Sequence, residues 1–252
     1  MLSFLKYDIP YELDSPERTV FHGEIIREKV FLRRLYREWY DVLLKRKPQL
    51  PTGKVIEVGS GGGFLKELDP DVLCADVLDL PSNDLTFSAL DMPFDNNEIS
   101  SIFMIDTFHH IPDAGRFLSE VSRVLKKDGL LIMIEPANSL WGRFIYKNFH
   151  HEPFDVDGNW TIPSSGPLSG ANGALPWIVF ERDSDVFNSK FPNLKLHHLN
   201  YHTPFRYLLS GGVSFKSLVP GFSYGFFKLA DKCLSGISKQ MSMFVTIVIR
   251  KV

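Results

Sequence analysis

The residues of clearest chemical meaning form a glycine-dense turn after a short β-branched run. Residues 54–65 read KVIEVGSGGGFL, so Glu57 stands two positions before Gly59. Because glycine has no Cβ, backbone N–H groups in such a turn approach a bound ligand closely. The stretch therefore predicts a strand, a ligand-binding turn and a helix start. Glu57 would repel a phosphate dianion, which favours a cationic or zwitterionic ligand.

Polar residues also follow the later apolar runs of the chain. Asp76 and Asp91 come after the second and third runs, and residues 106–110 and 135–138 follow the next two. In open parallel sheets, ligands bind beyond the carboxyl ends of the strands. We therefore expect these polar segments and the glycine turn to meet at one rim around the ligand.

Two pairs of adjacent histidines supply candidate catalytic groups. His109 and His110 belong to the rim, whereas His150 and His151 lie in the segment NFHHEPFD at residues 148–155. Histidine is the usual residue that removes a proton from an acceptor oxygen, so His110, His150 and His151 are the candidates. Each could instead bond to a nearby carboxylate and only fold its loop. Histidine and carboxylates also bind metals, but we predict no metal here.

Alternating apolar runs and helical patterns indicate how these residues are positioned. Nearly uniform apolar strands point to a parallel sheet covered on both faces. Predicted strands are residues 55–58, 71–76, 99–106, 130–134, 194–202 and 243–249, the last as an added edge of the sheet. Predicted helices are residues 16–47, 64–68 and 114–125. The first helix has a basic face, and it either packs on the domain edge or forms a lid over the site.

Composition limits the possible classes of protein. The chain has 252 residues and a formal net charge of −2, which gives no electrostatic basis for nucleic-acid binding. Its two cysteines, Cys74 and Cys233, make neither a metal cluster nor a disulfide framework and fit the cytoplasm. No apolar run approaches the roughly 20 residues of a membrane span. Residues 210–225 are apolar and rich in glycine, which leaves peripheral membrane contact or a lipid-linked substrate open.

Five motifs in order over residues 52–136 resemble class I S-adenosylmethionine-dependent methyltransferases of the small-molecule type. The residues EVGSGGG at 57–63 resemble the family's E/D-x-G-x-G-x-G loop, and Asp76 falls where the family has the acid that binds the ribose hydroxyls. Three further segments resemble later motifs of the family: ALDMPF at 89–94, IDTFHHIPD at 105–113 and FLSEVSRVLKKDG at 117–129. Asp128 departs from the family's paired glycines, and a short first helix leaves Asp79 as a lesser alternative for the ribose contact.

This resemblance implies an α/β fold, a Rossmann-like doubly wound sheet of seven strands in mixed orientation. It implies a single domain over residues 1–252, with an N-terminal helical cap or lid (1–50), a cofactor-binding core (52–136) and a C-terminal elaboration (137–252) that holds the acceptor. S-adenosylmethionine is the implied cofactor. The implied cofactor-binding residues are Glu57, Gly59, Ser60, Gly61, Gly63, Asp76, Val77, Asp91, Met92, Asp106 and Thr107.

The implied reaction is methyl transfer to a small-molecule acceptor, with O-methylation favoured, by a monomer or homodimer. One alternative is a binding protein that keeps the fold without catalysis. Another is a nicotinamide-dependent oxidoreductase, whose fingerprint G-x-G-x-x-G would place a third glycine at the position of Phe64.

Overall fold

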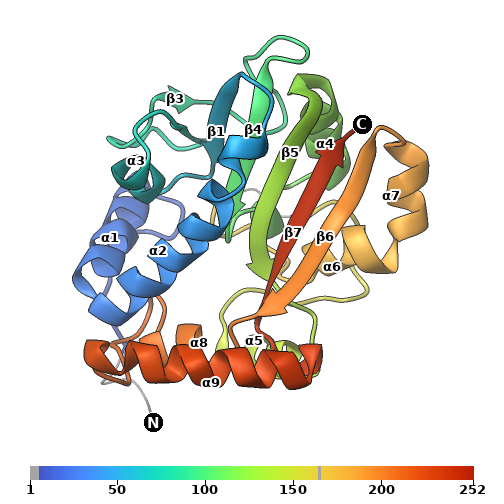
Figure 1. Ribbon diagram of the computed structural model, residues 1–252. Coiled ribbons are helices and arrows are strands. Elements are labelled where there is room, and N and C mark those ends of the chain that lie inside the picture. The colour runs from blue at the N-terminus through green and yellow to red at the C-terminus, as the bar shows by residue number, and fades with distance from the viewer. Residues whose placement is uncertain (1–5, 164–165) are drawn as a thin grey trace.

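The computed structural model describes residues 6–163 and 166–252, in which a twisted sheet is flanked by helices (Figure 1). The seven-stranded sheet has the order β3-β2-β1-β4-β5-β7-β6. Its strands are β1 (Lys54–Val58), β2 (Leu73–Asp76), β3 (Leu85–Thr86), β4 (Ile99–Ile105), β5 (Leu125–Pro136), β6 (Leu194–His202) and β7 (Phe244–Lys251). Strands β1 to β5 are parallel, while β7 is antiparallel to both of its neighbours. The predicted mixed α/β sheet is confirmed.

The position of the last strand corrects the sequence prediction. We expected residues 243–249 at an edge, but β7 lies between β5 and β6, and β6 forms the edge. The first six residues of β7 are all buried, whereas β6 is mostly exposed or half-buried. A continuous apolar run is typical of a strand covered on both faces, so the composition of β7 already indicated an interior place.

The N-terminal segment forms two helices instead of the one expected over residues 16–47. Helix α1 (Pro16–Glu28) begins after the N-cap Ser15, at the predicted residue 16, and α2 (Val30–Leu44) follows after a break at Lys29. The ammonium group of Lys29 donates to the carbonyl oxygens of Gly212 and Phe215 at 2.5 and 2.6 Å. These bonds satisfy a buried charge and tie the break between the helices to residues 212–215.

The remaining helices cover the sheet and extend its carboxyl end. They are α3 (Phe64–Leu68), α4 (Ala114–Val124), α5 (Leu140–Phe149), α6 (Leu175–Trp177), α7 (Ser184–Lys190), α8 (Arg206–Ser210) and α9 (Tyr224–Ile237). Short 3-10 turns occupy Lys47–Gln49, Phe108–His110, Gly221–Ser223 and Lys239–Met241, and a π-helical turn spans Ile178–Arg182. Helices α5, α8 and α9 gather beyond the end of the sheet (Figure 1).

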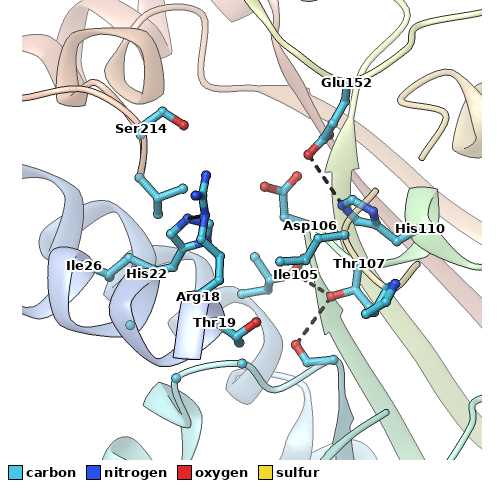
Figure 2. A pocket seen from close by; sticks show the side chains of 18 of the residues that line it. Arg18, Thr19, His22, Ile26, Ile105, Asp106, Thr107, His110, Glu152 and Ser214 are labelled. Atoms are coloured by element: carbon cyan, nitrogen blue, oxygen red, sulfur yellow. Dashed lines mark hydrogen bonds and ion pairs between the residues drawn. The ribbon is translucent and has the colours of Figure 1, made fainter. Parts of the chain in front are cut away.

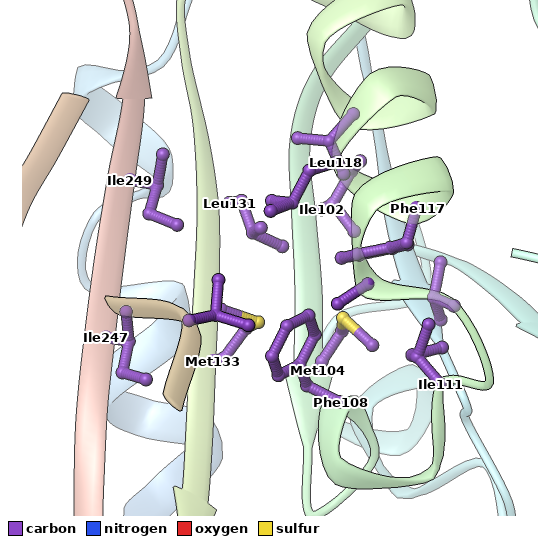
Figure 3. Close-up of a cluster of buried hydrophobic side chains, with 14 of the residues drawn as sticks. Ile102, Met104, Phe108, Ile111, Phe117, Leu118, Leu131, Met133, Ile247 and Ile249 are labelled. Atoms are coloured by element: carbon purple, nitrogen blue, oxygen red, sulfur yellow. The ribbon is translucent and has the colours of Figure 1, made fainter. Parts of the chain in front are cut away.

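The apolar core has one layer on each face of the sheet. Phe117 and Leu118 of α4 pack against Ile102 of β4 and Leu131 of β5 (Figure 3). On the other face, Phe31 and Trp39 of α2 belong to the second buried cluster. Both layers hold the strands rigidly, so the carboxyl ends of β1, β2, β4 and β5 are fixed relative to one another. In the described ranges, no helix is long and apolar enough to cross a bilayer.

Candidate functional site

A cavity of about 1120 Å³ opens at the carboxyl ends of the parallel strands. One wall consists of the residues that follow β1, β2 and β4, and α1 lies beside it. The opposite wall comes from residues 145–152 and 207–218. Figure 2 shows Arg18 and His22 of α1 facing Asp106, His110 and Glu152. The glycine turn, Asp76, part of the rim after β4 and helix α1 therefore surround one space, whereas Asp91 and residues 135–138, which we also expected at this rim, do not line it.

The glycine turn takes backbone conformations that favour glycine. Gly59, Gly61 and Gly63 have φ values of 73°, 49° and 72°, in the left-handed region. A Cβ on Gly59 would come within 2.2 Å of the Thr107 methyl carbon. The amides of Gly59 and Ser60 both donate to the carbonyl oxygen of Ala75, at 2.9 and 3.0 Å. The turn is thus locked to β2 and pressed against the rim after β4.

Asp76 ends β2 with its carboxylate at the cavity. Its two oxygens accept hydrogen bonds from the amides of Gly61 and Leu78, each at 3.1 Å. Burial raises the pKa of Asp76, and these backbone bonds oppose the rise. Asp79, the lesser alternative for the ribose contact, is exposed and does not line the cavity.

Seven of the predicted cofactor-binding residues line the cavity and four do not. Those that line it are Gly59, Ser60, Gly61, Asp76, Val77, Asp106 and Thr107. Gly63 begins α3, where a Cβ would meet the Ser82 side chain at 2.6 Å. Asp91 is exposed outside the cavity, and Met92 is buried in the core. Residues 87–90, a few positions earlier, form this part of the wall instead.

Glu57 lies beneath the turn and does not face the cavity. It is 1% exposed, and the thiol of Cys74 lies 3.9 Å from its carboxyl group. Burial raises the pKa of Glu57 to about 8, with Asp76 adding to the rise and a hydrogen bond from Tyr40 opposing it. The group is therefore mostly neutral at pH 7. We predicted from the sequence that Glu57 would favour a cationic ligand. The structure removes the basis of that prediction, because the carboxyl group is covered and does not face the cavity.

The rim after β4 is wrapped around a buried carboxylate from β5. Glu135 is fully buried and accepts hydrogen bonds from the amides of Thr107 and Phe108, at 2.9 and 2.7 Å. The ring nitrogen Nδ1 of His109 lies 2.8 Å from the same carboxylate. Asp106 takes a positive φ of 55° at the start of this rim. Burial raises the pKa of Asp106 to about 7, although His109 opposes the rise.

The two histidine pairs, which the sequence presents as separate candidates, meet on Glu152. The carboxylate of Glu152 lies 3.3 Å from Nε2 of His109 and 3.7 Å from Nε2 of His110. It also lies 3.6 Å from Nδ1 of His150 and 3.7 Å from Nε2 of His151. From the sequence, Glu152 is only one of the nearby carboxylates that could bond to a histidine and fold the loop. Its position next to two histidines was the available signal.

The environments give these histidines different protonation states. Burial lowers the pKa of His110 to about 4 and also lowers the pKa of His150. Burial acts in the same direction on His109, but its bonds with Glu135 and Glu152 prevail and raise its pKa well above the usual range. His110 and His150 are therefore neutral at pH 7 and able to accept a proton, and both line the cavity.

Helix α1 supplies cavity residues that sequence reasoning did not single out. Arg18 donates from Nε to Nε2 of His22 at 3.1 Å, and burial lowers the pKa of His22 to about 4. Thr19 lines the cavity, and its buried hydroxyl has no hydrogen-bond partner among residues 6–163 and 166–252. Buried polar groups are usually paired, so this hydroxyl indicates a polar ligand group nearby.

Two comparisons with known sequences both match this chain to methyltransferases. Residues 56–133 match a family model described as a methyltransferase domain. The chain is 34% identical over 153 residues to a demethylmenaquinone methyltransferase from Symbiobacterium thermophilum. That match covers 60% of this chain and 58% of the relative, so the chain spans a little over half of the curated relative's length.

Solved structures share the fold at low sequence identity. A geranyl diphosphate C-methyltransferase from Streptomyces coelicolor A3(2), in complex with Mg²⁺, geranyl diphosphate and S-adenosyl-L-homocysteine, is 16% identical with a TM-score of 0.50. The match covers 98% of this chain and 91% of that one. A complex of the Haloferax volcanii Trm112 methyltransferase activator with a methyltransferase matches at 10% identity and a TM-score of 0.52, covering 95% and 96%.

Proposed function

We propose that this chain, a class I S-adenosylmethionine-dependent methyltransferase as its sequence motifs predict, methylates an oxygen of a small-molecule acceptor. One observation carries the proposal: the neutral side chains of His110, at the rim after β4, and of His150, on the opposite wall, line the same cavity as Asp76. Pockets for one drug-sized ligand measure roughly 300–1,000 Å³. A cavity of about 1120 Å³ has room for the cofactor and a second molecule.

The residues of the first wall fit S-adenosylmethionine. Its backbone can come close to the ligand at Gly59 and Gly61, and the carboxylate of Asp76 would accept hydrogen bonds from both ribose hydroxyls. The hydroxyl of Thr19, which has no hydrogen-bond partner within the described part of the chain, would offer another polar contact. When bound, S-adenosylmethionine supplies a methyl group on a sulfonium, and the sulfur keeps the electron pair when the methyl carbon bonds to the acceptor.

The second wall, together with His110 at the rim after β4, would position and deprotonate the acceptor. Methyl transfer depends on holding the acceptor atom in line with the bond that breaks. An acceptor hydroxyl bonded to His110 or His150 would give its proton to the neutral imidazole as the oxygen attacks. His151 is more exposed than either, with 53% of its side chain accessible, and would relay that proton to solvent. All three histidines of the sequence prediction thus have a place in this proposal.

The proposal is tested by separating cofactor binding from turnover. We expect calorimetry to show one equivalent of S-adenosylhomocysteine bound, and labelled S-adenosylmethionine to methylate an oxygen in a panel of phenols, hydroquinones and sugars. Gly59→Ala should abolish both signals, because its Cβ would collide with Thr107. Gly225→Ala is the matched control, since nothing lies within 4 Å of a Cβ there.

Three outcomes would count against the proposal. A protein that binds no S-adenosylhomocysteine lacks the cofactor site. Binding without transfer to any acceptor would favour the non-catalytic alternative. A product methylated on carbon or nitrogen would keep the methyltransferase and overturn the choice of oxygen.

A further inference from the structure

We propose that His109, His110 and Glu152 bind one divalent transition-metal ion at the acceptor end of the cavity. The ligand site stands on the geometry of these three side chains. Its part in catalysis rests on the proposed function, because the ion would bind the acceptor oxygen.

The two imidazole rings are oriented as metal ligands commonly are. A ligand histidine usually donates its other ring N–H to a carboxylate or a backbone carbonyl, which fixes the tautomer. Nδ1 of His109 lies 2.8 Å from the Glu135 carboxylate, and Nδ1 of His110 lies 2.9 Å from the carbonyl oxygen of Gly170. In His110 this leaves the Nε2 lone pair free to face Glu152. In His109, which its two carboxylate partners keep protonated, an ion at Nε2 would displace the proton that now faces Glu152.

The spacing of the ligand atoms suits a shared ion. Nε2 of His109 and Nε2 of His110 lie 3.3 and 3.7 Å from oxygens of Glu152, and the three ligand atoms fall within 4.8 Å of one another. Metal–nitrogen and metal–oxygen bonds of about 2.0–2.2 Å place neighbouring ligand atoms roughly 3–3.5 Å apart. The contact at 3.7 Å is too long for a hydrogen bond, and a small contraction around an ion would satisfy all three groups.

Two further carboxyl groups beside the three ligands favour a cation. Asp106 and Glu135 lie behind the three ligands, with an oxygen of Asp106 4.0 Å from Nδ1 of His109. Two histidines and one carboxylate leave coordination positions open for substrate oxygens, a set typical of Fe²⁺, Mn²⁺, Co²⁺ or Zn²⁺ sites.

This site defines the class of acceptor more closely. An ion that binds a hydroxyl lowers the pKa of that hydroxyl, so an enol or a phenol with a neighbouring oxygen would be the preferred acceptor. With His110 holding the ion, proton removal falls to His150 or His151, which lie 3.6 and 3.7 Å from oxygens of Glu152.

The experiment uses Co²⁺ as the probe on full-length protein freed of metal by chelation. We expect one equivalent of Co²⁺ to bind by calorimetry and to produce visible d–d absorption. Glu152→Gln and His110→Gln should each weaken Co²⁺ binding at least about tenfold. His197→Gln, which removes an exposed histidine of β6, is the matched control and should bind as the wild type does.

Binding of S-adenosylhomocysteine by the same preparations reports on the cofactor site and the fold. Variants that retain it while losing Co²⁺ support the metal site. Absence of Co²⁺ binding up to millimolar concentration in a protein that binds S-adenosylhomocysteine overturns it, as does equal Co²⁺ binding by the wild type and both variants. If the wild type itself does not bind S-adenosylhomocysteine, the proposed function is wrong.

We infer independently that helices α5 and α9 form a face that docks on an anionic phospholipid bilayer. The exposed apolar residues on and beside α9 are spaced four, three and eight positions apart, which places them on one side of a helix. Phe222, Phe226, Leu229 and Ile237 are 86, 71, 63 and 80% exposed. On α5, Leu140, Phe144 and Phe149 are 71, 51 and 58% exposed. Single exposed apolar residues are normal, but a stripe of this size marks an interaction surface.

The charge of this face matches an anionic surface. Lys232 is exposed on α9, Arg143 and Lys147 belong to α5, and Lys228 of α9 pairs with Glu38 of α2 at 2.8 Å. Both helices are described in full, and their one acid, Asp231, is 2% exposed and paired with Arg206. A helix with an apolar stripe bordered by basic residues is typical of one that lies in the interface of an anionic membrane.

The face is continuous with the mouth of the cavity. Phe149 of α5 and Leu218 before α9 both line the cavity, although they are 58 and 52% exposed. Helices α5 and α9 lie at the same end of the molecule (Figure 1). An acceptor held in the membrane could therefore enter the cavity without crossing water.

Sedimentation with vesicles tests this surface. We expect the wild type to sediment with vesicles of equal phosphatidylglycerol and phosphatidylcholine, and less so with phosphatidylcholine alone. The double variant Phe222→Ser/Phe226→Ser should bind at least about tenfold more weakly, whereas Val186→Ser on α7, 44% exposed, should not change binding. Equal sedimentation of the double variant, or none by the wild type, would overturn the inference. So would a wild-type dimer that this double variant converts to a monomer.

Discussion

The two walls of the cavity are built in different ways. The cofactor wall comes from three nearby strand ends, and its backbone conformation is set by bonds such as those from the turn to Ala75. The acceptor wall joins segments far apart in the sequence through buried polar side chains. Lys29 holds residues 212–215 against α1, and Glu152 brings two histidine pairs together. One wall therefore depends on local backbone pattern and the other on single long-range contacts.

Arg206 is the clearest of those contacts. This side chain is almost completely buried, and its guanidinium lies 2.7 Å from Asp231 and 3.0 Å from Glu38. It also donates to the hydroxyl of Tyr224 at 2.7 Å. These bonds link α2, α8 and α9, so the guanidinium joins the N-terminal helices to the C-terminal elaboration.

The largest expected effect is the loss of this contact. Arg206→Leu should lower the free energy of unfolding by about 3–5 kcal/mol, because it leaves the buried carboxyl group of Asp231 without its partner. Urea unfolding measures the change. Arg250→Leu is the control: its pair with Asp128 is exposed, and such pairs contribute about 1 kcal/mol or less.

The same Arg206→Leu variant separates the two walls. Under conditions where it stays folded, it should still bind S-adenosylhomocysteine and lose turnover. Full turnover would mean that the acceptor wall does not need the contact. If Arg206→Leu lowers the free energy of unfolding no more than Arg250→Leu does, the buried contacts of Arg206 contribute no more than an exposed ion pair.

The second prediction concerns the cofactor wall. Asp76→Asn should weaken S-adenosylhomocysteine binding by about 1.5–3 kcal/mol, the usual range for hydrogen bonds to a charged group. Asp79→Asn is the control, because Asp79 is exposed outside the cavity. Calorimetry measures both. Unchanged affinity in Asp76→Asn would place the ribose contact elsewhere, and weakening by Asp79→Asn alone would assign it to Asp79.

The difference between the walls also explains what could be predicted from the sequence. The glycine turn, Asp76 and the rim after β4 follow from local residue types, since a left-handed turn between a strand and a helix has few solutions. The meeting of His110 and His151 at Glu152 could not be predicted, because it depends on how the loop after α5 packs against the rim. The break at Lys29 likewise depends on contacts with residues far away in the sequence, the carbonyl oxygens of Gly212 and Phe215.

The smallest expected effect is the change in stability at low pH, where Glu38 becomes protonated. Burial alone would raise the pKa of Glu38, but Arg206 and Lys228 prevail and lower it from 4.5 to about 2. A depressed folded-state pKa stabilises the protein above pH 4.5, and the contribution disappears as the pH falls toward 2. This carboxylate is partly exposed, which reduces the effect. We expect the free energy of unfolding of the wild type to exceed that of Glu38→Gln by about 1–2 kcal/mol at pH 7 and by almost nothing near pH 2.

Asp76 should respond to pH in the opposite direction. Burial raises its folded-state pKa above 3.8, so its contribution to stability is greatest below pH 3.8 and is lost as the pH rises through the folded-state value. Without ligand, Asp76→Asn should therefore gain stability relative to the wild type as the pH rises from 3 to 7, while Glu38→Gln loses it. Urea unfolding across this range measures both trends. If both variants follow the same trend, burial does not dominate the pKa of Asp76. The pKa of Asp76 rises while that of Glu38 falls only if the cost of burying Asp76 outweighs its hydrogen bonds.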